Sequence, residues 1–300
     1  MSNFVTTAFV QQYSTNIMML LQQEGSRLRN AVMEHGFVGK AGTVVEQFGA
    51  VSPVKNLARH SDTPLISTPQ DRRWVYPTDY DWADLIDNQD KLRMLIDPTG
   101  PYTRAGVMAM GRAMDDEIIN GFFGTNNTGE NGTNAVTFPS GQIVAANVGA
   151  SANTGLNVAK LRAAKKLLMQ AEVDLDTEQL FVGITAQQHD NLLNEVQAIS
   201  LDYTDRPVLV EGRIRSFMGF NFIHTERIPG GPSYAGSINT GGLYYVPCWA
   251  KSGLALGMWN DVQASVDKRP DKRNSWQVYV TATVGATRTE EKRCVQINCA

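Results

Sequence analysis

The longest uninterrupted pattern in the chain lies between Asp97 and Gly124 and predicts a single long helix. Apolar residues recur there at steps of three and four positions: Val107, Met110, Met114, Ile118 and Phe122. Pro98 and Pro101 precede the periodic part, and Gly124 stands where a left-handed C-terminal cap is expected. Charged residues interrupt this stripe or lie off it: Arg104, Arg112, Asp115, Asp116 and Glu117. We therefore expect one buried and one solvated face along a rod of roughly 35 Å.

A second pattern, near the C-terminus, has a period of two and predicts a long antiparallel hairpin. Apolar residues occupy alternate positions in two runs: Val262, Ala264 and Val266, then Trp276, Val278, Val280, Ala282 and Val284. The segment between the runs, residues 267–275, is polar and contains Pro270, as a hairpin tip does. Val295 and Ile297 begin one more alternating run, so we expect a further strand there.

The N-terminal part of the chain predicts an arm followed by a long hairpin. Residues 4–34 carry apolar side chains largely at helical spacing, typical of an amphipathic arm. Residues 43–51 and 72–82 form two extended runs, joined by a polar segment. The aromatic residues of the second run share one face: Trp74, Tyr76, Tyr80 and Trp82. A hairpin with so little apolar content near its tip has to lie on the rest of the fold or on another subunit, and we favour another subunit.

The middle of the chain predicts a compact mixed subdomain. Residues 125–142, rich in glycine and asparagine, form a loop without a phosphate-binding motif. A helix at 156–172 and a buried strand at Leu180–Ile184 come next, and Thr185 and Gln188 then form a capping box that starts a helix. Its apolar residues are Leu192, Leu193 and Val196. Further extended runs follow, at residues 208–210, 220–224 and 243–246.

Composition places the chain among soluble globular proteins. With 300 residues, of which 42% are hydrophobic, it can bury a sizeable core, and two subdomains are expected. Its apolar runs are too short to cross a bilayer, and its start lacks a secretory signal, so we expect synthesis in a cytoplasm. A net charge of -3 argues against general nucleic-acid binding. Three cysteines without a paired spacing are interpreted as reduced: Cys248, Cys294 and Cys299.

No catalytic, cofactor-binding or metal-binding residue is expected, and no cofactor. The four histidines are scattered along the chain: His35, His60, His189 and His224. Asp115, Asp116 and Glu117 are consecutive helical residues, whose side chains point about 100 degrees apart and so do not converge on one site. No G-x-S-x-G nucleophile motif occurs. The basic cluster of residues 268–273 is interspersed with aspartates, which fits a solvated tip or a salt-bridging contact to a neighbour.

Two groups of residues together resemble the major capsid proteins of tailed bacteriophages. Those similar to the central segment of that family are Asp97, Pro98, Tyr102, Gly111, Arg112, Asp115, Asp116, Ile118, Ile119 and the loop from Gly124 to Gly132. Those similar to its closing segment are residues 269–272, Trp276 to Val284, Gly285, Ala286 and Arg288. The resemblance covers most of the chain in order, and the joint order and spacing of these motifs are specific.

The resemblance implies an α+β coat-protein fold of the tailed-phage and herpesvirus type. It implies these divisions: an N-terminal arm (1–42), an extended loop (43–83), a peripheral domain with a long spine helix (84–155 and 260–300) and an axial domain (156–259). It implies a structural, non-catalytic protein that self-assembles into hexamers and pentamers of an icosahedral head around double-stranded DNA.

The same resemblance suggests the partners. A cleaved N-terminal scaffolding segment, present in some members, does not fit the short arm here, so a separate scaffolding protein is expected, together with a portal. DNA would be packaged without sequence specificity, and no membrane contact is expected. The protein would be made in the cytoplasm of the bacterial host and reside in the virion. Two alternatives remain: an encapsulin-like nanocompartment shell that packages protein cargo, and a small cytoplasmic hydrolase.

Overall fold

The computed structural model describes residues 22–55, 62–63, 65–87, 99–195, 209–210, 213–238 and 240–300. Its helices are α2 (Thr99–Phe123), α3 (Val158–Gln170) and α4 (Ala186–Leu193). Short 3-10 turns are η2 (Arg29–Ala31), η3 (Ser140–Gln142), η4 (Lys251–Gly253), η5 (Pro270–Lys272) and η6 (Glu291–Arg293). Several sheets complete the fold, so the expected α+β class is confirmed.

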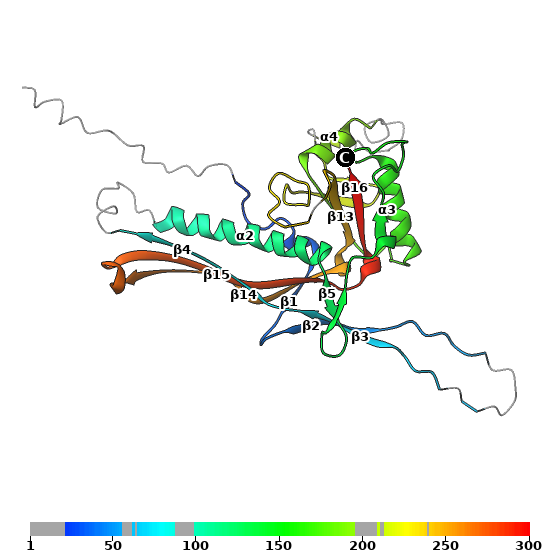
Figure 1. Cartoon of the computed structure of the whole chain (residues 1–300), viewed down its shortest axis with the longest axis horizontal. Coiled ribbons are helices and arrows are strands. Elements are labelled where there is room, and N and C mark those ends of the chain that lie inside the picture. Colours follow the sequence, from blue (N-terminus) through cyan, green and yellow to red (C-terminus); the bar gives the residue numbers. More distant parts are fainter. Residues whose placement is uncertain are drawn as a thin grey trace, which may run out of the picture.

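A four-stranded sheet carries the long helix. Its order is β1 (Met33–Gly36), β14 (Leu254–Arg269), β15 (Ser275–Arg288) and β4 (Thr78–Ile86). The predicted C-terminal hairpin is therefore confirmed as β14 and β15, and the inward residues Val278, Val280 and Val284 are fully buried. α2 lies along β15 (Figure 1). Gly106 permits this close approach, because a Cβ there would lie 2.7 Å from Val280 Cγ2 on β15.

A six-stranded sheet forms the compact part of the molecule. Its order is β11 (Ser216–Phe217), β12 (Phe220–His224), β8 (Leu180–Ile184), β13 (Tyr244–Ala250), β16 (Cys294–Cys299) and β7 (Ile143–Val144). The strands predicted at 180–184, at 220–224 and around Val295 are confirmed. α3 packs against β16, and its N-cap Asn157 accepts the N–H of Lys160 at 2.8 Å. Gln188 accepts the N–H of Thr185 at 3.1 Å, as the predicted capping box requires.

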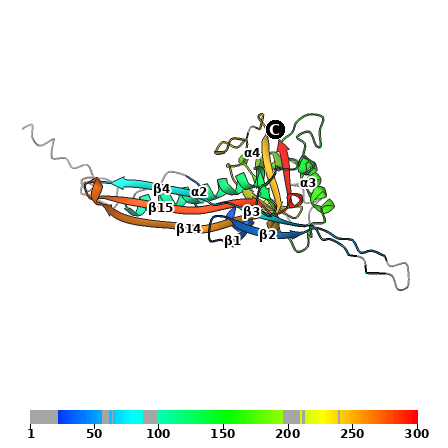
Figure 2. The same cartoon turned by 60° about the horizontal axis from the view of Figure 1, so that its bottom comes forward.

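The remaining strands form two smaller sheets. One has the order β2 (Gly42–Phe48), β3 (Gln70–Val75), β5 (Asn126–Thr128) and β6 (Asn134–Val136), and the other pairs β9 (Leu209–Val210) with β10 (Arg213–Ile214). The predicted loop at 125–142 thus contains a short hairpin, whose turn uses positive φ at Gly129 and Gly132. Figures 1 and 2 show β2–β3 and β14–β15 leaving the body in opposite directions.

The prediction of a single extended run at residues 72–82 is wrong, because these residues belong to two strands in two different sheets. β3 ends at Val75 and β4 begins at Thr78, with Pro77, which has no N–H to donate, between them. The four aromatic residues consequently do not share a face. Trp74 donates to the Gly129 carbonyl at 2.7 Å in the sheet of β2 and β3, whereas the aromatic residues of β4 pack toward α2.

The prediction of a helical N-terminal arm is also wrong for the part of the arm that the structure describes. Residues 22–34 form no α-helix but pass through η2 into β1, which pairs in parallel with β14. The apolar residues Leu28, Ala31 and Val32 of the arm are buried all the same. Residues 4–21 of the predicted arm lie outside the described residues.

The long helix differs from its prediction in three details. Met110, Met114, Ile118 and Phe122 are buried as expected, but Val107 is 39% exposed. Asp115, expected on the solvated side, is fully buried. Gly124 does not adopt positive φ, so the expected left-handed cap is absent at this residue. The expected start at Asp97 and Pro98 lies outside the described residues.

Candidate functional site

Three consecutive acidic residues of α2 contact three different parts of the chain. The first, Asp115, is the anchor of residues 22–28, called here the N-terminal segment. Its Oδ1 accepts the Ser26 hydroxyl at 2.6 Å and the N–H of Leu28 at 3.1 Å, and its Oδ2 accepts the N–H of Arg27 at 3.1 Å. One turn earlier, Gly111 touches the segment, because a Cβ there would lie 2.5 Å from the Gly25 carbonyl carbon.

The second acidic residue, Asp116, binds the loop that follows β12. Its carboxylate accepts hydrogen bonds from Nε and Nη2 of the Arg227 guanidinium, and the Nε–Oδ1 distance is 2.6 Å. A planar guanidinium suits this two-point geometry. The hydrogen-bonded carboxylate raises the pKa of Arg227. This pair joins the spine helix to the compact part of the molecule.

The third acidic residue, Glu117, binds β4. It accepts the Tyr80 hydroxyl at 3.0 Å and the Thr78 hydroxyl at 3.5 Å. Burial raises the pKa of Glu117, and the hydrogen bond from Tyr80 partly offsets this. The three carboxylates diverge, as the helical geometry predicted, and each fixes a different element. Their arrangement is that of a structural junction, because they surround no common reacting atom.

The C-terminal end of α2 is fixed by a buried arginine. The guanidinium of Arg288, on β15, donates to the carbonyl of Gly124 at 2.7 Å and also to the carbonyl of Phe122. It reaches Val136 of β6 as well, at 3.2 Å. Burial lowers the pKa of Arg288. Backbone carbonyls that no helical N–H can satisfy are thus satisfied by a side chain from a distant strand, which is why Gly124 needs no left-handed cap.

The protruding segment of residues 42–75, called here the extension, consists of β2, β3 and the residues that join them. It exposes apolar side chains. Phe48 is 66% exposed and Leu65 is 97% exposed. The other exposed apolar residues of the extension are Val51, Val54 and Ile66. Its root is fixed by an ion pair between the buried Arg73 and the partly buried Glu291. A groove of about 720 Å³ lies between this root and residues 289–293. The extension is therefore anchored at its base and uncovered farther out.

The tip of the β14–β15 hairpin carries the basic cluster noted in the sequence. Arg269 forms an ion pair with Asp271 at 2.8 Å and also donates to Gln277. The ammonium of Lys268 lies 4.7 Å from the centre of the Trp276 ring. Part of the cluster is therefore paired within the tip itself.

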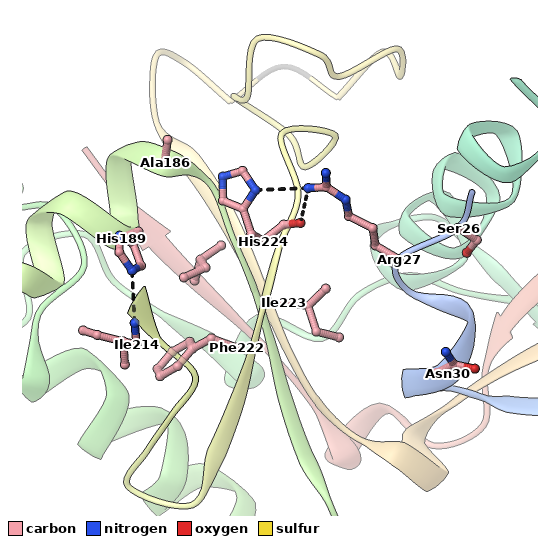
Figure 3. Close-up of a pocket in the computed structure, with 10 residues that line it drawn as sticks. Ser26, Arg27, Asn30, Ala186, His189, Ile214, Phe222, Ile223 and His224 are labelled. Atoms are coloured by element: carbon pink, nitrogen blue, oxygen red, sulfur yellow. Dashed lines mark hydrogen bonds between the residues drawn. The ribbon is translucent and has the colours of Figure 1, made fainter. Parts of the chain in front are cut away.

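The candidate chemical residues do not form a reactive cluster in the described part of the chain. His189 and His224 line a cavity of about 740 Å³ between the N-terminal segment, α4 and β12 (Figure 3). His35 lies elsewhere, beside the Phe37 ring, and His60 is outside the described residues. Among the described residues, His, Cys, Asp and Glu nowhere gather in a group that could hold a metal ion. The three cysteines are buried thiols: Cys248, Cys294 and Cys299.

The comparison with protein families decides the identity. The family model described as phage capsid protein matches residues 5–300. The chain belongs to the phage capsid protein family. The sequence-based identification of a structural major capsid protein is thereby confirmed, and the role implied by the family is that of a self-assembling subunit of the virion shell. No curated protein matches the chain.

Solved capsid structures show the same fold as this capsid protein. A chain of the capsid of cyanophage P-SCSP1u superposes with a TM-score of 0.77 at 12% identity, over 98% of this chain and 94% of that chain. For the mature capsid of bacteriophage PhiM1, the TM-score is 0.71 at 10% identity, over 97% of this chain and 92% of that chain. For the capsid of cyanophage Pam1, the TM-score is 0.70 at 14% identity, over 100% of this chain and 99% of that chain. No helix in the described ranges is long and apolar enough to span a membrane.

Proposed function

We propose that this capsid protein tiles an icosahedral phage head as hexamers and pentamers, and that its extension lies across a second copy. One observation carries the proposal. The extension exposes Phe48, Val51, Val54, Leu65 and Ile66, and no described part of the same chain covers them. Neighbouring exposed apolar side chains on an anchored, protruding element are typical of an interface. Many repeats of one such contact would stabilise a closed shell.

We propose that the divisions implied by the sequence are functional units. These are the arm (1–42), the extended loop (43–83), the peripheral domain (84–155 and 260–300) and the axial domain (156–259). The separate six-stranded and four-stranded sheets support a division between axial and peripheral parts, and the place of β7 and β16 in the six-stranded sheet favours assigning these two strands to the axial part. β4 crosses the boundary at residue 83, and its pairing with β15 favours assigning the whole strand to the peripheral part.

We infer that assembly uses a separate scaffolding protein and a portal, and that the shell encloses double-stranded DNA. The net charge of -3 favours contacts with DNA that are few and independent of sequence. The protein would be synthesised in the cytoplasm of the bacterial host before entering the virion. It would act by geometry and not by catalysis, which agrees with the divergent carboxylates of α2.

Sedimentation velocity and negative-stain microscopy of the purified full-length protein test this proposal. Closed shells or ring-shaped capsomers are expected as the concentration rises, with or without co-expressed scaffolding protein. Monomers at every concentration and under both expression conditions would contradict it. The contents of purified particles separate two kinds of shell: nuclease-protected DNA is expected for a phage head, whereas a defined protein cargo would indicate a nanocompartment.

A further inference from the structure

The N-terminal segment has a second attachment, formed by the side chain of Arg27. Arg27 Nη1 lies 3.1 Å from His224 Nδ1 and donates to the His224 carbonyl oxygen at 2.9 Å. His224 Nε2 lies 3.0 Å from Glu226 Oε1, which in turn accepts the N–H of Ala186 at 2.7 Å. Figure 3 shows Arg27 reaching from the N-terminal segment to the imidazole of His224 on β12. The contacts form a chain from the N-terminal segment to the start of α4.

The chemistry of the two side chains fixes the state of the imidazole in this chain of contacts. A guanidinium can only donate hydrogen bonds, so His224 Nδ1 has to be the acceptor. The ring proton is then on Nε2, where it faces the carboxylate of Glu226. The contact with Arg27 thus requires a neutral imidazole in one tautomer.

Protonation of His224 would act on its two neighbours in opposite ways. A proton on Nδ1 removes the acceptor and places a positive charge against the Arg27 guanidinium, whereas the pairing with Glu226 persists and gains charge. The other titratable side chain lining the cavity is His189, on α4, which accepts the N–H of Ile214. Arg227, close by in sequence, is already paired with Asp116.

We propose that Arg27 and His224 form a pH-sensitive latch that holds the N-terminal segment on β12 when the imidazole is neutral and is weakened on acidification, when only the bond from Arg27 to the His224 carbonyl remains. The anchor at Asp115 stays closed, because it consists of donors to a carboxylate and contains no histidine. Acidification therefore loosens the attachment of the N-terminal segment to β12 and leaves its attachment to α2 unchanged. The latch does not depend on the proposed assembly.

The latch is tested by thermal unfolding of the unassembled full-length protein at pH 8 and at pH 5.5, between which histidine side chains change charge. Arg27→Ala should lower the Tm by about 2 °C at pH 8, where a hydrogen bond is lost. At pH 5.5 the same substitution should lower the Tm by less, because the protonated imidazole repels the guanidinium and only the bond to the His224 carbonyl is then lost. The matched control is Ser26→Ala, in the same segment, whose cost should be equal at both pH values, because it removes a contact with Asp115.

A second variant isolates the imidazole. His224→Asn keeps an acceptor near the position of Nδ1 but cannot be protonated in this range. In that background, the effect of Arg27→Ala on the Tm should be the same at both pH values. An equal cost of Arg27→Ala at pH 8 and pH 5.5 in the wild-type background would overturn the latch, as would a pH dependence that survives in His224→Asn.

Discussion

The hydroxyl of Ser26 donates a 2.6 Å hydrogen bond to Asp115 across a sequence separation of 89 residues. Asp115 is fully buried, and the backbone N–H groups of Arg27 and Leu28 share the same carboxylate. A buried charge is tolerated where hydrogen bonds replace its hydration. The side chain of Asp115 on α2 therefore fixes the position of the N-terminal segment.

Replacing Asp115 should destabilise the protein strongly. Asp115→Leu leaves the Ser26 hydroxyl and two backbone N–H groups without an acceptor, which should cost about 3–5 kcal/mol of unfolding free energy. Asp115→Asn keeps one acceptor oxygen and should cost less. Urea unfolding followed by circular dichroism measures both. If Asp115→Leu were within about 1 kcal/mol of wild type, the proposed anchor would be wrong.

Arg288 should matter to stability far more than the exposed arginines. Arg288→Met deprives the last carbonyls of α2 of their donors, and we expect a loss of about 2–4 kcal/mol in the same urea assay. Arg269→Met, at the exposed hairpin tip, is the control and should leave the unfolding free energy close to that of wild type. Equal effects of the two substitutions would show that capping by Arg288 contributes little.

The thiols should be inert while the protein is folded. Burial raises the pKa of Cys294 and of Cys299 to about 12, and it also raises the pKa of Cys248. The folded protein therefore keeps these groups protonated at pH 8, where a free cysteine begins to form its reactive thiolate. Iodoacetamide at pH 8 should label them only after denaturation, as read by intact mass. Labelling of folded protein, or multimers on gels that a reductant removes, would contradict this.

The periodicity of apolar residues correctly predicted those strands and helices in which one face is buried in the core. Val278, Val280 and Val284 alternate along β15 because one face of that strand packs under α2. The same logic located β8 and β12, and the capping box of α4 followed from local backbone chemistry at Thr185. These features depend on neighbours in sequence, which is why the sequence alone was sufficient for them.

Other features depend on partners far away in the chain, and periodicity could not reveal them. Asp115 looked solvated because its polar partners belong to the N-terminal segment. Arg288 was part of the family resemblance, but nothing local indicated that it caps α2. The extended run at 72–82 was mistaken for one strand, although Pro77 was a signal that it ends and a new strand begins. The contact between Arg27 and His224 had no sequence signal at all.

Shortening the extension should impair assembly and spare folding. The N–H of Gly49 bonds to the Pro69 carbonyl at 2.7 Å, so replacing residues 50–68 with Asn-Gly leaves the β2–β3 ladder and its root in place. Loss of a few hundred Å² of intersubunit apolar contact at about 25 cal/mol per Å² removes several kcal/mol per interface. Circular dichroism should show a cooperative melt, and sedimentation should show no shells. A shortened protein that melts without cooperativity would mean instead that the extension packs on its own subunit.

The position of the extension on a neighbour can be measured by photo-crosslinking from Leu65, whose side chain is 97% exposed in the isolated chain. A photoreactive amino acid at this position should give covalent dimers after irradiation of assembled particles, and only monomers when the same variant is irradiated as dissociated subunits. Mass spectrometry of the dimer band should join residue 65 to a peptide of a second chain, distinguished by mixing isotopically labelled and unlabelled subunits. Crosslinks confined to one chain in intact particles would contradict the proposal that the extension lies across a second copy.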